Sequence, residues 1–147
     1  MNVSRRVGQL LVGVVLAASL FGCGAAVRAD CQVVMWDAGD APPEEGALIP
    51  AEIEPLIVPA DVDWSSSQFG QGAAGQPTLT LALGPDAAAR MAEFTRSNVG
   101  SYVPVALNGT VVVVPVVNGP IEDGVVQIEA NSGGEARFAP FGACVGG

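Results

Sequence analysis

The stretch VALNGTVVVVPVVNGPI, residues 105–121, constrains the fold more than any other part of the chain. Ten of its side chains are β-branched or leucine, which favours strands. Its first Asn-Gly pair, at 108–109, is the strongest short signal for a hairpin turn. Pro115 has no backbone N–H, so the ladder is expected to stop or reach a sheet edge there. The stretch therefore predicts an antiparallel hairpin, a break and a second turn.

The residues before this stretch predict a strand followed by a helix. TLTLAL (78–83) alternates as a half-buried strand does. Pro85 suits a first helical turn, residues 86–97 are rich in helix formers, and Asn98 with Gly100 suits a left-handed helix end. The face expected to pack on the sheet contains Ala88, Met91, Ala92 and Thr95.

Two shorter segments complete the expected strands. In 31–36, Val33 and Met35 share one face while Val34 and Trp36 share the other, which is typical of a strand inside a sheet, and 125–130 predicts another strand. The fold class is therefore α+β, a mostly antiparallel sheet with a helix packed on one face. We expect residues 78–147 to form its core, closed by the N-terminal strand. Within 23–77, the Pro- and Gly-rich part from 37 to 77 is expected to be a long loop with little regular structure, containing one short strand at PLIVP (55–59).

Residues 1–22 are predicted to be a signal peptide. Arg5 and Arg6 precede an uncharged apolar stretch, 7–22, that is shorter than the roughly 20 residues of a membrane-spanning helix. A signal peptide predicts that the chain is exported from the cytoplasm.

Two cleavage schemes fit the end of this segment. LFGC resembles a lipobox, in which Cys23 accepts a lipid and the chain is cut just before it. VRAD instead satisfies an ordinary signal peptidase, with a mature chain starting at Asp30. The first scheme predicts a lipid anchor at the outer face of the cytoplasmic membrane or cell envelope.

The cysteine count bears on this choice. A lipidated Cys23 leaves two cysteines, Cys31 and Cys144, and an even pair in an exported chain indicates a disulfide. Two buried free thiols are the alternative. The chain has too few soft ligands for a metal site, and none is predicted.

The charge balance excludes several function classes. Fifteen Asp or Glu oppose six Arg, a net charge of −9, which argues against nucleic acid as a partner. The chain has no His, and its serines have no nearby base, so we predict neither an enzyme nor a cofactor. Eight acids occur between residues 37 and 63 without a basic residue: Asp37, Asp40, Glu44, Glu45, Glu52, Glu54, Asp61 and Asp63. They are expected to be a solvated segment; the alternative is a small-ligand or cation site, with Asp61 and Asp63 sharing calcium.

Three aromatic residues are candidates for partner binding. Trp36, Trp64 and Tyr102 are the kind of side chain that anchors an interface. In a chain with 5% aromatic residues, core packing is the competing interpretation.

The order of these elements resembles a known family, the head subdomain of the first periplasmic domain of SecD and SecDF. The resemblance rests on GQPTLTLALGPDAAARMAEF, FTRSNVG, VALNG, VVVVPVVNGPI and DGVVQI, within residues 75–128. SecD and SecDF assist protein export, and their head is thought to touch the translocating polypeptide. The resemblance supplies no catalytic residue, and their proton-driven motor does not transfer to a chain without further membrane helices.

The expected function is therefore non-enzymatic. The chain is expected to be an envelope lipoprotein that binds an envelope or exported protein through an exposed sheet edge or the acidic loop.

Overall fold

The structure is a computed structural model that describes residues 31–145. The predicted signal peptide, the lipidation site Cys23 and the alternative cleavage before Asp30 lie outside these residues. Within them, no helix has the length and apolar character needed to cross a membrane.

The strands form two antiparallel sheets, where the sequence predicted one. The first has the order β2-β1-β5-β6 and the second the order β3-β4-β7. The first sheet contains β1 (Val33–Trp36), β2 (Pro55–Ile57), β5 (Val105–Leu107) and β6 (Thr110–Val113). The second contains β3 (Val62–Gln71), β4 (Pro77–Leu83) and β7 (Val125–Glu129). The helices are η1 (Pro59–Asp61), α1 (Pro85–Ser97), α2 (Glu135–Phe138) and α3 (Phe141–Cys144).

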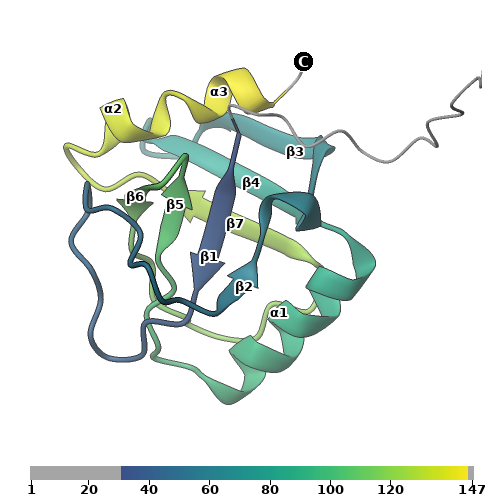
Figure 1. Cartoon of the computed structure of the whole chain (residues 1–147). Coiled ribbons are helices and arrows are strands. Elements are labelled where there is room, and N and C mark those ends of the chain that lie inside the picture. The colour runs from purple at the N-terminus through teal and green to yellow at the C-terminus, as the bar shows by residue number, and fades with distance from the viewer. Residues whose placement is uncertain (1–30, 146–147) are drawn as a thin grey trace, which may run out of the picture.

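The two sheets face each other across the main core. Their strands cross, with α1 near one end of the molecule and α2 and α3 at the other (Figure 1). Fully buried side chains from both sheets fill the space between them, among them Val33, Met35, Leu79, Leu81 and Ile128. The α+β class is confirmed.

The hairpin at the Asn-Gly pair is confirmed. Asn108 (φ 51°) and Gly109 (φ 89°) both adopt the left-handed backbone that this turn requires, and β5 pairs with β6 across it. Pro115 ends the regular ladder but not the pairing. Its carbonyl accepts the Val103 N–H (2.9 Å), and an isolated bridge joins Tyr102 to Val116.

The outer edge of β6, the strand that leads to Pro115, is covered by the segment 46–48. Val111 accepts a hydrogen bond from Gly46 N–H (2.7 Å) and donates one to the Ala47 carbonyl (2.8 Å). A bridge between Leu48 and Thr110 extends the contact. The loop therefore acts as an irregular strand along this edge.

The short strand expected at PLIVP is present as β2, but the expectation of little regular structure over the rest of 37–77 is wrong in its second half. β3 occupies Val62–Gln71 and pairs with β4. Its buried side chains Val62 and Trp64 are two positions apart, but the next one, Ser67, is three positions after Trp64. The spacing changes because a bulge lies between Asp63 and Gln68. A bulge breaks the alternation by which a strand is recognised.

The helix is confirmed with a small shift of its buried face. α1 begins at Pro85, and its buried residues are Ala87, Met91 and Thr95, so Ala88 and Ala92 are only partly buried. Thr95 Oγ1 accepts the Ile121 N–H (2.9 Å), which ties the segment before β7 to the helix.

The C-terminal segment closes the core. Phe138 and Phe141 are fully buried and stack edge to face with ring centroids 5.5 Å apart. A disulfide joins Cys144 of α3 to Cys31, 113 residues earlier, with a Cα–Cα distance of 5.7 Å.

Candidate functional site

The acidic, proline-rich segment 37–54 packs on the outer face of the first sheet. Trp36 is 5% exposed and forms a second apolar cluster with Ala106 and Val111. From the segment, Ala38, Ala47, Ile49 and Ile53 pack against this cluster. Trp36 is thus the main surface on which the segment folds.

Hydrogen bonds hold the segment 37–54 in place near its start and again at Glu45. Ala38 N–H donates to the Tyr102 carbonyl (2.9 Å), and Tyr102 N–H donates to the Gly39 carbonyl (2.8 Å). Further along, the Glu45 carboxylate accepts hydrogen bonds from Asn131 and Arg137, both at 2.6 Å. The segment is therefore fixed to β-structure and to the C-terminal helices.

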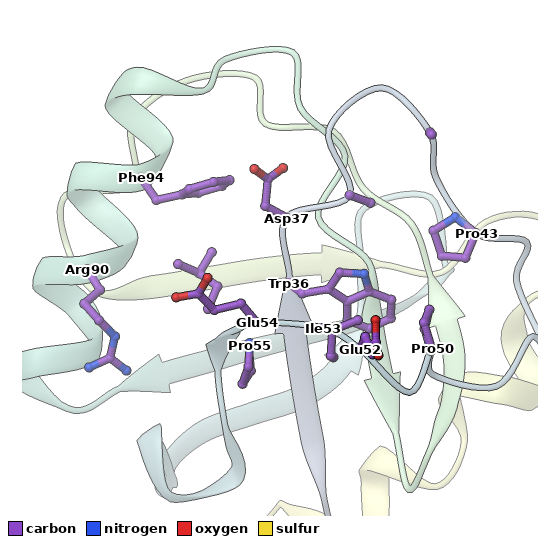
Figure 2. Close-up of a pocket in the computed structure, with 13 residues that line it drawn as sticks. Trp36, Asp37, Pro43, Pro50, Glu52, Ile53, Glu54, Pro55, Arg90 and Phe94 are labelled. Carbon is purple, nitrogen blue, oxygen red and sulfur yellow. The ribbon is translucent and has the colours of Figure 1, made fainter.

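A groove of about 700 Å³ lies between this segment and α1. Arg90 and Phe94 project from α1 on one side, while Pro43 and Pro50 lie on the other, next to Trp36 (Figure 2). The full lining is Trp36, Asp37, Ala38, Ala41, Pro43, Pro50, Glu52, Ile53, Glu54, Pro55, Leu56, Arg90 and Phe94. We call this surface the Trp36 groove.

The Trp36 groove is acidic because its arginine is already paired. Arg90 Nη2 lies 2.7 Å from Asp61 Oδ2. The remaining arginines of the described chain, Arg96 and Arg137, pair with Glu122 and Glu45. No cationic side chain within residues 31–145 is therefore left for the three groove carboxylates, which belong to Asp37, Glu52 and Glu54. Figure 2 shows Asp37 and Glu54 between α1 and Trp36.

The other candidate residues predicted from the sequence do not line the Trp36 groove. Tyr102 contacts the start of the segment through its backbone but does not line the groove. Trp64 is 8% exposed and belongs to the main core. Asp61 lies beside the groove as the partner of Arg90, and Asp63 lies on β3.

The two aspartates proposed to share a cation each have their own partners. Asp61 Oδ2 accepts Val58 N–H (2.9 Å) as well as Arg90, and Asp63 Oδ1 accepts both the N–H (3.0 Å) and the hydroxyl (2.6 Å) of Ser65. The hydrogen bond from the Ser65 hydroxyl is the main reason that the pKa of Asp63 is lowered. Across residues 31–145, no group of three or more Cys, Asp or Glu side chains is arranged to hold a metal ion.

Sequence reasoning missed two groove residues. Neither Arg90 nor Phe94 belongs to the helix face that was expected to pack on the sheet, and neither was a candidate site residue. They are four residues apart, so they share one face of α1. The sequence shows this four-residue spacing, but it does not show which segment packs beside this face of α1.

Together these features define a small α+β domain of two packed antiparallel sheets with an acidic groove on its surface. The chain belongs to the SecDF P1 head subdomain family, whose model matches residues 38–137. This match extends the likeness upstream from 75–128 to include the segment that forms the groove.

Curated relatives are protein translocase subunits. The chain is 36% identical over 63 residues to SecD of Thermobaculum terrenum, covering 43% of this chain and 12% of that protein. It is 36% identical over 66 residues to SecD of Acidaminococcus fermentans (45% and 16%) and 33% identical over 78 residues to SecDF of Thermus thermophilus (53% and 10%). The chain thus spans less than one fifth of the length of each relative.

Solved SecDF structures share the fold. One, described as a membrane component that enhances protein export, superposes with a TM-score of 0.60 at 20% identity, over 78% of this chain and 61% of that one. Another, SecDF in its super-membrane-facing form, gives a TM-score of 0.59 at 21% identity, over 76% and 18%.

Proposed function

We propose that this chain is an exported, lipid-anchored and non-enzymatic module that binds extended polypeptide in the Trp36 groove as part of protein export. The observation that carries the proposal is the groove itself, an open acidic surface with aromatic and proline side chains. Its relatives are named protein translocase subunits, which makes an exported chain the favoured partner.

The chemistry of the groove favours segments that carry lysine or arginine beside apolar residues. Ile53, Leu56 and Phe94 are partly exposed and offer apolar contact. Asp37, Glu52 and Glu54 attract cations because no arginine of residues 31–145 neutralises them. Surface charges of this kind increase association rates and select partners more than they add affinity.

The binding test uses the full chain and a fluorescent peptide that combines lysines with leucines. Glu52→Gln/Glu54→Gln is expected to weaken binding and flatten its salt dependence. Asp40→Asn/Glu44→Gln changes the net charge equally at two exposed positions outside the groove lining, so it should bind as the parent does. Equal binding by both variants would refute the groove as the site. Thermal stabilisation by calcium alone would favour the cation alternative.

Lipid attachment has a separate test. Mass spectrometry of the protein from the membrane fraction should show acylation on Cys23, and Cys23→Ser should release the chain from the membrane. A mature chain beginning at Asp30 would instead establish ordinary cleavage.

A further inference from the structure

Among residues 31–145, the outer edge of β7 is the open strand edge. β7 pairs only with β4 among residues 31–145. The Leu83 N–H donates to Gly124 O and the Ala130 N–H to Pro77 O, both at 2.9 Å. In an antiparallel ladder these bonds alternate along the strand, so the N–H and C=O groups of Gln127 and Glu129 point away from β4.

The other three strand edges are protected. The segment 46–49 covers β6. β2 has three residues and starts with Pro55, which lacks a donor. β3 is interrupted by its bulge, and α3 packs beside it. β7 has none of these features, since it is a five-residue strand without proline or bulge.

An apolar cavity adjoins this edge. It has a volume of about 210 Å³ and extends from β7 to the Pro115–Val117 segment and the inner face of α1. Its lining includes Met35, Met91, Val103, Val117, Ile121 and Ile128. A strand added to β7 would direct every second side chain toward this side of the sheet, where the cavity offers space for an aliphatic group.

The charges around β7 indicate which residue types would favour binding at the two ends of such an added strand. Glu122 and Asp123 precede β7, and Glu129 ends it. Arg96 pairs with Glu122, and both side chains are largely exposed, so Arg96 offsets only one of these three carboxylates. Lysine or arginine at the ends of an added strand would complement the other two.

We propose that β7 binds an extended polypeptide by strand addition, taking segments in which aliphatic residues alternate with others and basic residues flank them. Backbone hydrogen bonds to Gln127 and Glu129 would provide affinity, and the cavity would select the inward side chain. This inference rests on the proposed function for its occupant, an extended chain outside this protein, but it names a surface other than the Trp36 groove.

The test uses a labelled peptide in which valine alternates with threonine between terminal lysines, and the full chain. Gln127→Pro removes the central outward N–H, and proline is tolerated on an edge strand where the N–H faces outward. Gln127→Ala keeps that N–H and is the matched control. We expect Gln127→Pro to bind the peptide about tenfold or more weakly than Gln127→Ala does, because the hydrogen bond is lost and the proline ring blocks the approach.

Hydrogen exchange on the parent chain provides a second measurement that does not depend on the folding of the proline variant. Bound peptide should slow exchange at the amides of Gln127 and Glu129, while those of Val126 and Ile128 are already protected by β4. Unchanged exchange at 127 and 129 would overturn strand addition. If the groove double variant at Glu52 and Glu54 loses this peptide while Gln127→Pro keeps it, the inference fails and the proposed function stands. If the parent binds neither this peptide nor the lysine-leucine peptide, both fail.

Discussion

Arg90 Nη2 lies 2.7 Å from Asp61 Oδ2, which ties one wall of the Trp36 groove to the turn before β3. The pair also sets the charge of the groove, because it neutralises the arginine in the lining. Asp37, Glu52 and Glu54 are left to determine the sign of the electrostatic potential in the groove.

Asp61→Asn tests this relationship. The Arg90 side chain is 48% exposed, so loss of the pair should cost at most about 1 kcal/mol of unfolding free energy. Arg90 would then add its positive charge to the groove, and lysine-rich peptide should bind more weakly than to Asp40→Asn, which has the same net charge. Denaturant titration and fluorescence anisotropy measure the two effects; identical affinities would show that Arg90 does not influence the groove.

Glu45 should hold the segment 37–54 in place. It accepts hydrogen bonds from Asn131 and Arg137, and its side chain is 23% exposed. Glu45→Ala is expected to lower the unfolding free energy by about 1–2 kcal/mol, since charge-assisted hydrogen bonds are stronger than neutral ones. It should also speed hydrogen exchange at Gly46 and Val111, with the neighbouring exposed Glu44→Ala as the control. Unaltered exchange at both amides would show that Trp36 packing alone fixes the segment.

The Cys31–Cys144 bridge should be a large part of the stability. Replacing both cysteines by serine is expected to cost about 2–5 kcal/mol, because the bridge closes a long loop in the unfolded chain. Reductant should lower the denaturation midpoint of the parent and leave the double variant unchanged. A parent that is insensitive to reductant after unfolding would contradict the bridge.

Asp63 should make stability pH-dependent in acid. Its pKa is lowered from the ordinary value of 3.8 chiefly by the Ser65 hydroxyl. A lowered folded-state pKa gives stability that is present above the unfolded value and is lost as the pH falls through the folded one. Ser65→Ala should flatten the dependence of the denaturation midpoint on pH below about pH 4, whereas Ser132→Ala, at an exposed serine elsewhere, should not.

The fold could be predicted from the sequence where local turn and helix signals agreed with the pattern of buried residues. The Asn108-Gly109 turn needs positive φ at both positions, and Pro85 begins a helix, so the hairpin and α1 could be placed without tertiary information. β3 could not, because its bulge and its serines remove the alternation that identifies a strand. The division into two sheets also depends on long-range pairing that leaves no local pattern.

Only part of the candidate site could be predicted from the sequence. Trp36 was selected as an aromatic candidate, and the acidic segment was recognised as unusual, yet neither indicated that the segment folds back on Trp36 beside α1. The neutralisation of Arg90 by Asp61 joins residues 29 positions apart, so the sign of the groove's charge required the three-dimensional arrangement. Trp64 and Tyr102 were equally plausible from sequence, and only the contacts in the structure separate them from Trp36, since Trp36 lines the groove while Trp64 packs in the main core.

The central claim is that the Trp36 groove receives exported polypeptide, and site-specific crosslinking in living cells tests it most directly. A photo-reactive phenylalanine analogue at Phe94 places the probe in the groove, and the same analogue at Val99, which is 60% exposed and outside the lining, is the control. With a defined exported polypeptide arrested during translocation, we predict crosslinks from position 94, few from 99, and loss of the former in the Glu52→Gln/Glu54→Gln background. Absence of crosslinks from position 94, or equal yields from both positions, would contradict the account.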